Sequence, residues 1–212
     1  MGDNLAGSTS ADYMSTPTMT KALCAEGYYC PGGDKWPTHK TNFCPTGYKC
    51  PEGSSDKTGC SPGTYQFNKI QGKCLDCPPG YFCDTALQAR ANPHMSFVSD
   101  NKCPTGHWCE TNTQTSTQNK CPPGTYNPKE GAREKSACIP APPGFYIDVA
   151  GANSLDINKV CNAGHYCMLG SYRADPDGTT PTTFGGYNVL YRTIGGQCSD
   201  GHYCPQGAPK QI

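Results

Sequence analysis

Sixteen cysteines are the residues of this chain whose number and spacing point most directly to a chemistry. An even number is what a complete set of disulfide bonds requires. Zinc is the competing use of closely spaced cysteines, and it favours paired C-x2-C or C-x4-C knuckles, usually with histidine. Here the common spacing is C-x5-C, and only Cys74 and Cys77 are separated by two residues. The spacing therefore favours disulfide bonds, and we expect neither a metal site nor a cofactor.

Twelve of the cysteines enclose a repeated seven-residue frame with glycine at position 4 and mostly aromatic residues at positions 5 and 6. The frames are Cys24–Cys30, Cys44–Cys50, Cys77–Cys83, Cys103–Cys109, Cys161–Cys167 and Cys198–Cys204. The glycine is expected to supply the positive φ of a tight turn without strain. The aromatic pair is expected to form a short ribbon whose rings cover the disulfide.

The other four cysteines belong to a second motif, in which SPGTY or PPGTY follows the first cysteine. The motif Cys60-SPGTY leads to Cys74, and Cys121-PPGTY leads to Cys138. Residues 141–147 then repeat the first frame as APPGFYI, so both cysteines of that frame are missing together. Joint loss is expected if the two positions of a frame bond each other, because a lone thiol would be reactive.

Pairing each cysteine with its neighbour predicts eight local disulfide bonds. The alternative is a crossed pattern, in which Cys60 or Cys74 bonds a cysteine of a seven-residue frame. The predicted bonds are Cys24–Cys30, Cys44–Cys50, Cys60–Cys74, Cys77–Cys83, Cys103–Cys109, Cys121–Cys138, Cys161–Cys167 and Cys198–Cys204. Closing a seven-residue loop removes about 2.4 kcal/mol of unfolded-state entropy. Eight such bonds offer up to about 20 kcal/mol, against an ordinary domain stability of roughly 5–15 kcal/mol.

The repeats divide the chain into five segments. Residues 1–23 form a Ser/Thr-rich arm, and 24–43 form a partial repeat. Residues 44–102 and 103–160 are two copies of one unit, the second of which lacks one disulfide at Ala141 and Ile147. Residues 161–212 form a C-terminal cysteine-rich segment.

The composition supports a fold held by disulfides. Leu, Ile, Val and Phe together make up only 23 of 212 residues, about 11%, which excludes a single large core. We therefore expect a small disulfide-rich fold of mostly short β-strands and loops, strung as tandem elongated repeats. Helical composition occurs only at 84–91 and 129–137, and 187–193 could form a strand.

Charge and hydropathy narrow the location and the partners. Lys+Arg and Asp+Glu number 17 each, so no basic face for nucleic acid is expected, and no apolar run is long enough to span a membrane. Residues 1–23 lack the apolar centre of a signal peptide, and the chain ends eight residues after Cys204. We therefore expect a mature extracellular or cell-surface product, or part of a longer array.

No catalytic constellation stands out, and we expect that the protein is not an enzyme. GxSxG, HExxH and P-loop motifs are lacking. The sequence Asp175-Pro176-Asp177-Gly178 resembles the start of a calcium loop but lacks the later glutamate, so a plain turn is favoured. His107, His165 and His202 occupy an aromatic position of the frame, which favours a packed ring over a metal or pH-sensing role.

Glycosylation is a further candidate modification. The chain has no N-x-Ser/Thr acceptor, but Ser/Thr-rich stretches resemble O-glycan acceptors, with plain solvated loops as the alternative. The candidate acceptors are Thr16, Thr18, Thr113, Thr115, Thr180 and Thr182.

Residues 60–83, with the pattern CxPGTY followed by CxxCPxGYxC, resemble ephrin-receptor-like cysteine-rich repeats. These are akin to growth-factor-receptor, tumour-necrosis-factor-receptor and EGF-like modules. The resemblance extends, more loosely, over about two thirds of the chain. It implies an extracellular, rod-like protein with a structural or binding role, as in surface-coat and flagellar-hair-type proteins of single-celled eukaryotes.

Three classes of function follow from these patterns. The first is a structural subunit of a filament, hair or surface coat that self-associates and carries glycans. The second is a ligand-binding cysteine-rich ectodomain, centred on an exposed aromatic residue such as Trp36 or Trp108. The third is a secreted enzyme or inhibitor, for which no single protruding loop stands out.

Overall fold

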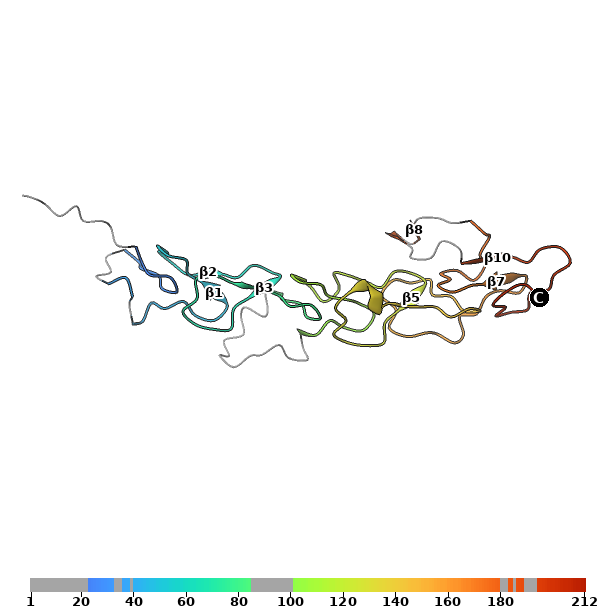
Figure 1. The fold of residues 1–212 in the computed structure, drawn as a ribbon, viewed down its shortest axis with the longest axis horizontal. Helices are drawn as coiled ribbons and strands as arrows, with labels where there is room; N and C mark the ends of the chain where they lie inside the picture. The colour runs from blue at the N-terminus through green and yellow to red at the C-terminus, as the bar shows by residue number, and fades with distance from the viewer. Residues whose placement is uncertain are drawn as a thin grey trace, which may run out of the picture.

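The chain forms an elongated rod in which order along the sequence is order in space (Figure 1). The computed structural model describes residues 23–32, 36–38, 40–84, 101–179, 183–184, 186–188 and 194–212. Short antiparallel strand pairs and eight local disulfide bonds build this part of the chain, without a large core. The predicted fold class is therefore confirmed.

The described strands form five two-stranded sheets, each antiparallel. β1 (Tyr48–Lys49) pairs with β2 (Thr58–Gly59), β3 (Thr64–Tyr65) with β4 (Leu75–Asp76), β5 (Thr125–Tyr126) with β6 (Ile139–Pro140), β7 (His165–Cys167) with β10 (Gly195–Gln197), and β8 (Thr183–Phe184) with β9 (Tyr187–Asn188). All but the β8–β9 pair lie along the rod, and β8 projects from its side in Figure 1.

The 3-10 turn η2 (Lys135–Ala137) lies wholly within the described ranges, and Asn101 is also in 3-10 conformation. The turn η2 occupies only the end of the helix predicted at 129–137. The predicted strand at 187–193 begins as β9, and its remaining residues lie outside the described part of the chain, as do residues 85–91 of the other predicted helix.

One backbone turn repeats nine times along the rod. The frames begin at residues 24, 44, 60, 77, 103, 121, 141, 161 and 198, and we call them turns 1 to 9, with positions 1 to 7 in each. In every turn the N–H of position 5 donates to the C=O of position 2, at 3.0–3.3 Å. The glycine at position 4 has a φ between 78° and 91°, as predicted, which suits a type II turn.

The two PGTY motifs are turns 3 and 6 of this series rather than a separate motif. Gly63 and Gly124 hold position 4, with φ of 85° and 84°. Each of the predicted repeats 44–102 and 103–160 thus contains three turns.

Consecutive turns stack by a reciprocal pair of backbone hydrogen bonds. In turn 5 the Gly106 N–H donates to the C=O of Asn127 at 2.7 Å, and the Cys121 N–H of turn 6 donates back to the Gly106 C=O at 2.8 Å. The same pair recurs at all eight junctions, at 2.7–2.9 Å. Each position-5 residue also pairs with the residue that precedes the next turn, as His107 does with Lys120. The rod is therefore a ladder of identical junctions.

A left-handed residue after position 7 provides a third bond at the junctions. The Gly151 N–H after turn 7 donates to the C=O of Cys121, the first residue of turn 6, at 2.7 Å. Ile70 and Asn112 hold the same place with φ of 59° and 64°, the only positive φ values of non-glycine residues in the described ranges. The stack imposes this backbone conformation even on Ile70, a β-branched residue that seldom adopts it.

Position 4 requires glycine for a second reason that the sequence did not reveal. A Cβ built on Gly106 would lie 2.1 Å from the carbonyl oxygen of Gly151, and one on Gly124 would lie 2.2 Å from that of Gly170. In both cases the obstructing residue closely follows the turn two steps ahead, because Gly151 comes after turn 7 and Gly170 after turn 8. Each turn is thus covered by the next two turns of the rod.

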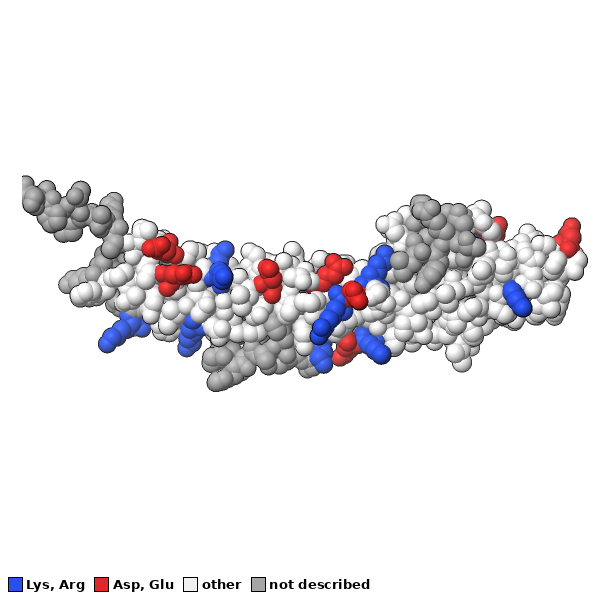
Figure 2. Space-filling model, in the orientation of Figure 1, with Lys and Arg blue, Asp and Glu red and all other residues white. Residues whose placement is uncertain are grey.

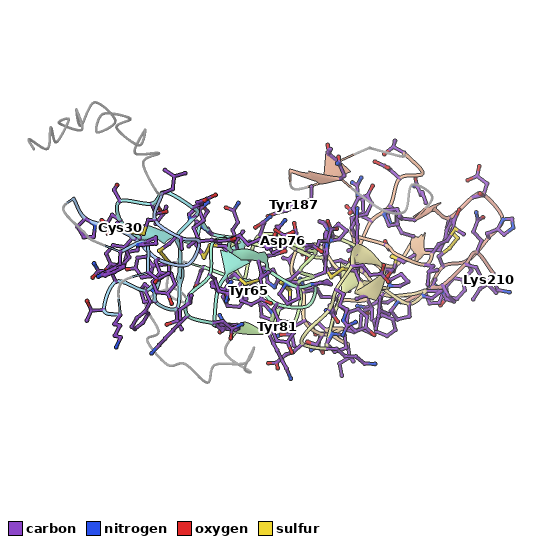
Figure 3. The ribbon with its side chains drawn as sticks, turned by 60° about the vertical axis from the view of Figure 1, so that its left-hand side comes forward. Cys30, Tyr65, Asp76, Tyr81, Tyr187 and Lys210 are labelled. Carbon is purple, nitrogen blue, oxygen red and sulfur yellow. A yellow bond between two sulfur atoms is a disulfide. The ribbon has the colours of Figure 1, made fainter. Side chains whose placement is uncertain are left out.

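The interior of the rod consists largely of half-cystines and the rings beside them. Tyr65, Phe67 and Tyr81 pack against the buried Cys77–Cys83 disulfide, and the rings of Tyr65 and Phe67 lie 4.8 Å apart. Tyr65 and Tyr81 are marked in Figure 3. The expectation that aromatic rings cover a disulfide is therefore met at this turn.

Candidate functional site

All sixteen cysteines are consumed in local disulfide bonds, so none of them is free to bind a metal or act as a nucleophile. The bonds are Cys24–Cys30, Cys44–Cys50, Cys60–Cys74, Cys77–Cys83, Cys103–Cys109, Cys121–Cys138, Cys161–Cys167 and Cys198–Cys204. Their Cα–Cα distances are 5.6–6.0 Å, within the usual range for disulfides. Neighbour pairing is confirmed, the crossed pattern is wrong, and sulfur atoms lie along the length of the rod (Figure 3).

Buried amides replace the second cysteine in turns 3 and 6. Gln66 and Asn127 hold position 7 and are 3% and 2% exposed. Asn127 donates from Nδ2 to the His107 carbonyl oxygen at 3.0 Å, and its Oδ1 accepts the Lys129 N–H at 3.0 Å. Gln66 likewise donates to Lys73 and accepts from Asn68. The shared Gly and Tyr of the PGTY motifs could have revealed these residues, because they match positions 4 and 6 of the frame.

Removal of the Asn127 amide should destabilise turn 6. Asn127→Ala removes the buried amide and its bonds to the His107 carbonyl and the Lys129 N–H, which should cost about 1–3 kcal/mol. Asn153→Ala is the control, because Asn153 is exposed and should cost less than about 0.5 kcal/mol. Denaturant unfolding with intact disulfides measures both. Equal losses would contradict a structural role for the Asn127 amide.

Turn 7 keeps the common geometry without sulfur. Ala141 and Ile147 are buried at positions 1 and 7, and the Gly144 N–H donates to the Cys167 C=O at 2.8 Å. The Ala141 N–H donates to the Gly124 C=O at the same distance. Stacking therefore does not need a bond within every turn.

Restoring the missing cysteines should create a ninth disulfide. The double variant Ala141→Cys/Ile147→Cys should oxidise without added oxidant and gain about 2 kcal/mol, because it closes a seven-residue loop. Intact mass and thiol titration measure the bond, and denaturant unfolding measures the gain. Each single variant should show one free thiol. Two unreacted thiols in the double variant would show that turn 7 differs from its neighbours.

The three frame histidines hold position 5, as the sequence indicated. His107 Nδ1 donates to the Thr105 carbonyl oxygen at 2.9 Å, and His202 Nδ1 lies 3.3 Å from the Asp200 carbonyl oxygen. His165 lies within strand β7. Within the described ranges, no group of three or more His, Cys, Asp or Glu residues is arranged to hold a metal ion.

The acidic turn near residue 177 uses its carboxylates locally. Asp177 accepts the N–H and hydroxyl of Thr179, and these bonds hold the pKa of Asp177 below its usual value. Arg173 pairs with Asp177 at 3.2 Å and with Asp175 at 3.6 Å. Both carboxylates therefore have partners within the turn itself.

On the face of the rod drawn in Figure 2, the described charged side chains form no extended region of one sign. Figure 2 shows acidic and basic side chains interspersed along the visible face of the rod. One ion pair joins Lys159 to Asp148, and the hydrogen bond between them raises the pKa of Lys159. A hollow of about 400 Å³ lies beside η2. Asn127, Lys129, Glu130, Ser136 and Ile139 are among the residues that line it.

The glycosylation candidates separate by exposure. Thr113 is 1% exposed, and its hydroxyl donates to the Glu110 carbonyl oxygen at 2.7 Å, so this hydroxyl is not accessible in the folded chain. Thr115 is exposed and stays a candidate. Thr16, Thr18, Thr180 and Thr182 lie outside the described residues.

The two tryptophans differ in accessibility. Trp36 is 69% exposed, whereas Trp108 is half-buried and donates from Nε1 to Glu110 at 3.1 Å. Trp36 is therefore the better candidate for a recognition residue.

No protein-family model matches the sequence, and no curated protein is significantly similar to it. No helix in the described part of the chain has the length and apolar character needed to cross a membrane.

Proposed function

We propose that the protein is an extracellular or cell-surface structural repeat protein, a subunit of a filament, hair or coat. The observation that carries the proposal is the identical junction between each turn and the next, repeated eight times along one axis. Such a ladder has no internal feature that limits its length, and each turn depends mainly on its neighbours.

The disulfide chemistry supports a location outside the reducing cytosol. Eight bonds in a chain of 212 residues are typical of secreted proteins and domains. The resemblance of residues 60–83 to ephrin-receptor-like repeats favours the same location. An O-glycan on Thr115 would suit a surface protein and belongs to the proposal.

The geometry suits mechanical and chemical persistence. Each disulfide joins cysteines 6 to 17 residues apart, so a stretching force cannot extend the loop that it closes, and a single nick within that loop does not release it. The buried frame residues leave proteases few extended segments in the described turns. A filament or coat outside the cell benefits from resistance to both stretching and proteolysis.

Electron microscopy of the purified oxidised chain over increasing concentration tests the proposal. We expect ordered linear assemblies whose width matches one rod or a small bundle of rods. Dispersed monomers at every concentration would overturn it. A reduced and alkylated sample is the control and should show no ordered assembly.

The exposed Trp36 favours one alternative, a ligand-binding ectodomain. Exposed aromatic side chains often anchor protein or glycan contacts. A glycan array and a cell-surface binding assay with the chain and with Trp36→Ala test this alternative. Binding that the substitution abolishes would support it, and equal binding by both chains would remove Trp36 from consideration.

A further inference from the structure

We infer that the two ends of the rod are complementary, so that turn 1 of a second copy stacks on turn 9 through the junction used within the chain. The inference rests on the proposed structural function and names the contact that would join its subunits. Three features of the ends support it: an unfilled surface, unpaired backbone groups and a matching first turn.

The unfilled surface lies over the last two position-4 glycines. In turns 1 to 7 this glycine is buried, whereas Gly164 and Gly201 are exposed. A Cβ built on either of them would meet nothing within 4 Å. The difference follows from the stack, because turns 8 and 9 lack the turn two steps ahead that covers the others.

The unpaired groups belong to turn 9. In turns 1 to 8 the position-4 glycine donates its N–H to the next turn and accepts an N–H from it. The N–H and C=O of Gly201, at the corresponding place, have no backbone partner among the described residues. These are the two groups that bond the next turn everywhere else along the rod.

Turn 9 already has the conformation that carries a further turn. Gly201 has a φ of 80°, and the His202 N–H donates to the Ser199 C=O as in the other turns. Tyr203 and Ile212 exchange backbone hydrogen bonds at 3.0 and 3.2 Å. In turn 5 the corresponding bond runs from the Trp108 N–H to the C=O of Asn119, which lies two residues before turn 6 begins. The backbone of turn 9 is therefore already in the conformation of the turns that carry another turn.

Turn 1 offers the matching groups. The Cys24 N–H and the Cys30 C=O hold the places that bond a preceding position-4 glycine elsewhere, and they have no backbone partner within the described ranges. Leu23 immediately precedes Cys24 and is exposed. Elsewhere in the rod, the residue that precedes a turn pairs with position 5 of the turn before it, as Phe43 does with Tyr28. The inferred register sets Leu23 of one copy against His202 of the other, with Gly201 bonded to Cys24 and Cys30.

Both ends also expose apolar surface. Leu23 is 58% exposed at the first turn, and Tyr203 and Ile212 are each 66% exposed at the last. Cys30 and Lys210 mark these opposite ends of the rod in Figure 3. Because the contact joins different surfaces, it does not close on itself, and it generates a linear polymer.

Sedimentation velocity and small-angle scattering of the full oxidised chain, over a range of concentrations, test the inference with matched variants. Gly201→Asn places a side chain in the inferred contact, and Asn112 shows that asparagine is accommodated at positive φ in this fold. Gly178→Asn is the control, because Gly178 has a similar φ of 78° and open space but lies outside the turns. We expect Gly201→Asn to weaken association about tenfold or more, and Gly178→Asn to behave as wild type.

A complementary pair of blocked ends makes the test specific. Leu23→Glu places a charge at the other side of the inferred contact. Each variant alone should associate at least about tenfold more weakly than wild type, whereas an equal mixture should form dimers and no longer species at concentrations where wild type polymerises, because each protein keeps one intact end. A midpoint of unfolding for Gly201→Asn equal to that of Gly178→Asn, and one for Leu23→Glu equal to that of wild type, exclude misfolding as the cause.

The outcomes separate the inference from the proposed function. Wild type that assembles, together with Gly201→Asn that assembles equally well, would overturn end-to-end stacking and leave assembly through the sides. A mixture that forms no dimers would overturn the inferred register. Wild type that stays monomeric at all concentrations would overturn both the inference and the structural proposal.

Discussion

Replacing Gly106 by alanine should destabilise the protein by about 3–5 kcal/mol, whereas Gly201→Ala should cost only about 1–2 kcal/mol. The two glycines share the same turn, with φ of 78° and 80°, so the backbone penalty of an L-residue is common to both. Only Gly106 faces the carbonyl oxygen of Gly151, at 2.1 Å from a built Cβ. The difference between the two losses in free energy of unfolding is therefore the cost of placing a methyl group where turns two steps apart are in close contact.

Denaturant unfolding with intact disulfides measures both variants, and hydrogen exchange shows where each chain opens. Gly178→Ala is a further control for positive φ in open space. Because neighbouring turns share the same contacts, opening in Gly106→Ala should centre on turns 5 to 7. Equal losses at Gly106 and Gly201 would contradict the inferred packing of each turn against the second one ahead.

Reduction should unfold the entire rod under otherwise native conditions. Local cross-links restrict the unfolded chain by up to about 20 kcal/mol in the chain-entropy model, more than an ordinary domain stability of roughly 5–15 kcal/mol. The apolar side chains cannot compensate, because Leu, Ile, Val and Phe number only 23. We expect a larger radius of gyration and loss of amide protection after reduction and alkylation.

The alkylating agent without reductant is the control, and it should add no label because the chain has no free cysteine. A fully alkylated chain that kept the radius and the protection of the oxidised rod would contradict a fold held by disulfides. Partial reduction should give intermediates that lose protection near the opened bond first, because contacts lie mainly between neighbouring turns.

The local features of the rod could be predicted from the sequence. Cysteines six residues apart with a glycine between them predicted closed turns and a positive φ, and both are present at Cys77–Cys83 and Gly80. The joint loss of cysteine at Ala141 and Ile147 indicated which positions bond. These features depend on short stretches of chain, so spacing and residue type determine them.

The features that depend on distant segments could not be predicted. The contact of Gly106 with Gly151 joins residues whose separation varies with loop length, so it leaves no regular spacing. Thr113 resembled an exposed acceptor because its neighbours in sequence are polar, but the stack buries it. At residues 129–137 helix-forming residues were overridden, because the chain must return through Cys138 to strand β6.

Amide hydrogen exchange of the position-4 glycines, followed by NMR in dilute oxidised protein, tests the stacked turns most directly. In turns 1 to 8 each of these N–H groups donates to the next turn, so we expect strong protection at residues such as Gly106 and Gly124. Gly201 should exchange at nearly the rate of an unfolded chain, because its N–H has no backbone partner among the described residues. Exchange at Gly106 and Gly124 as fast as at Gly201 would contradict the stack of turns.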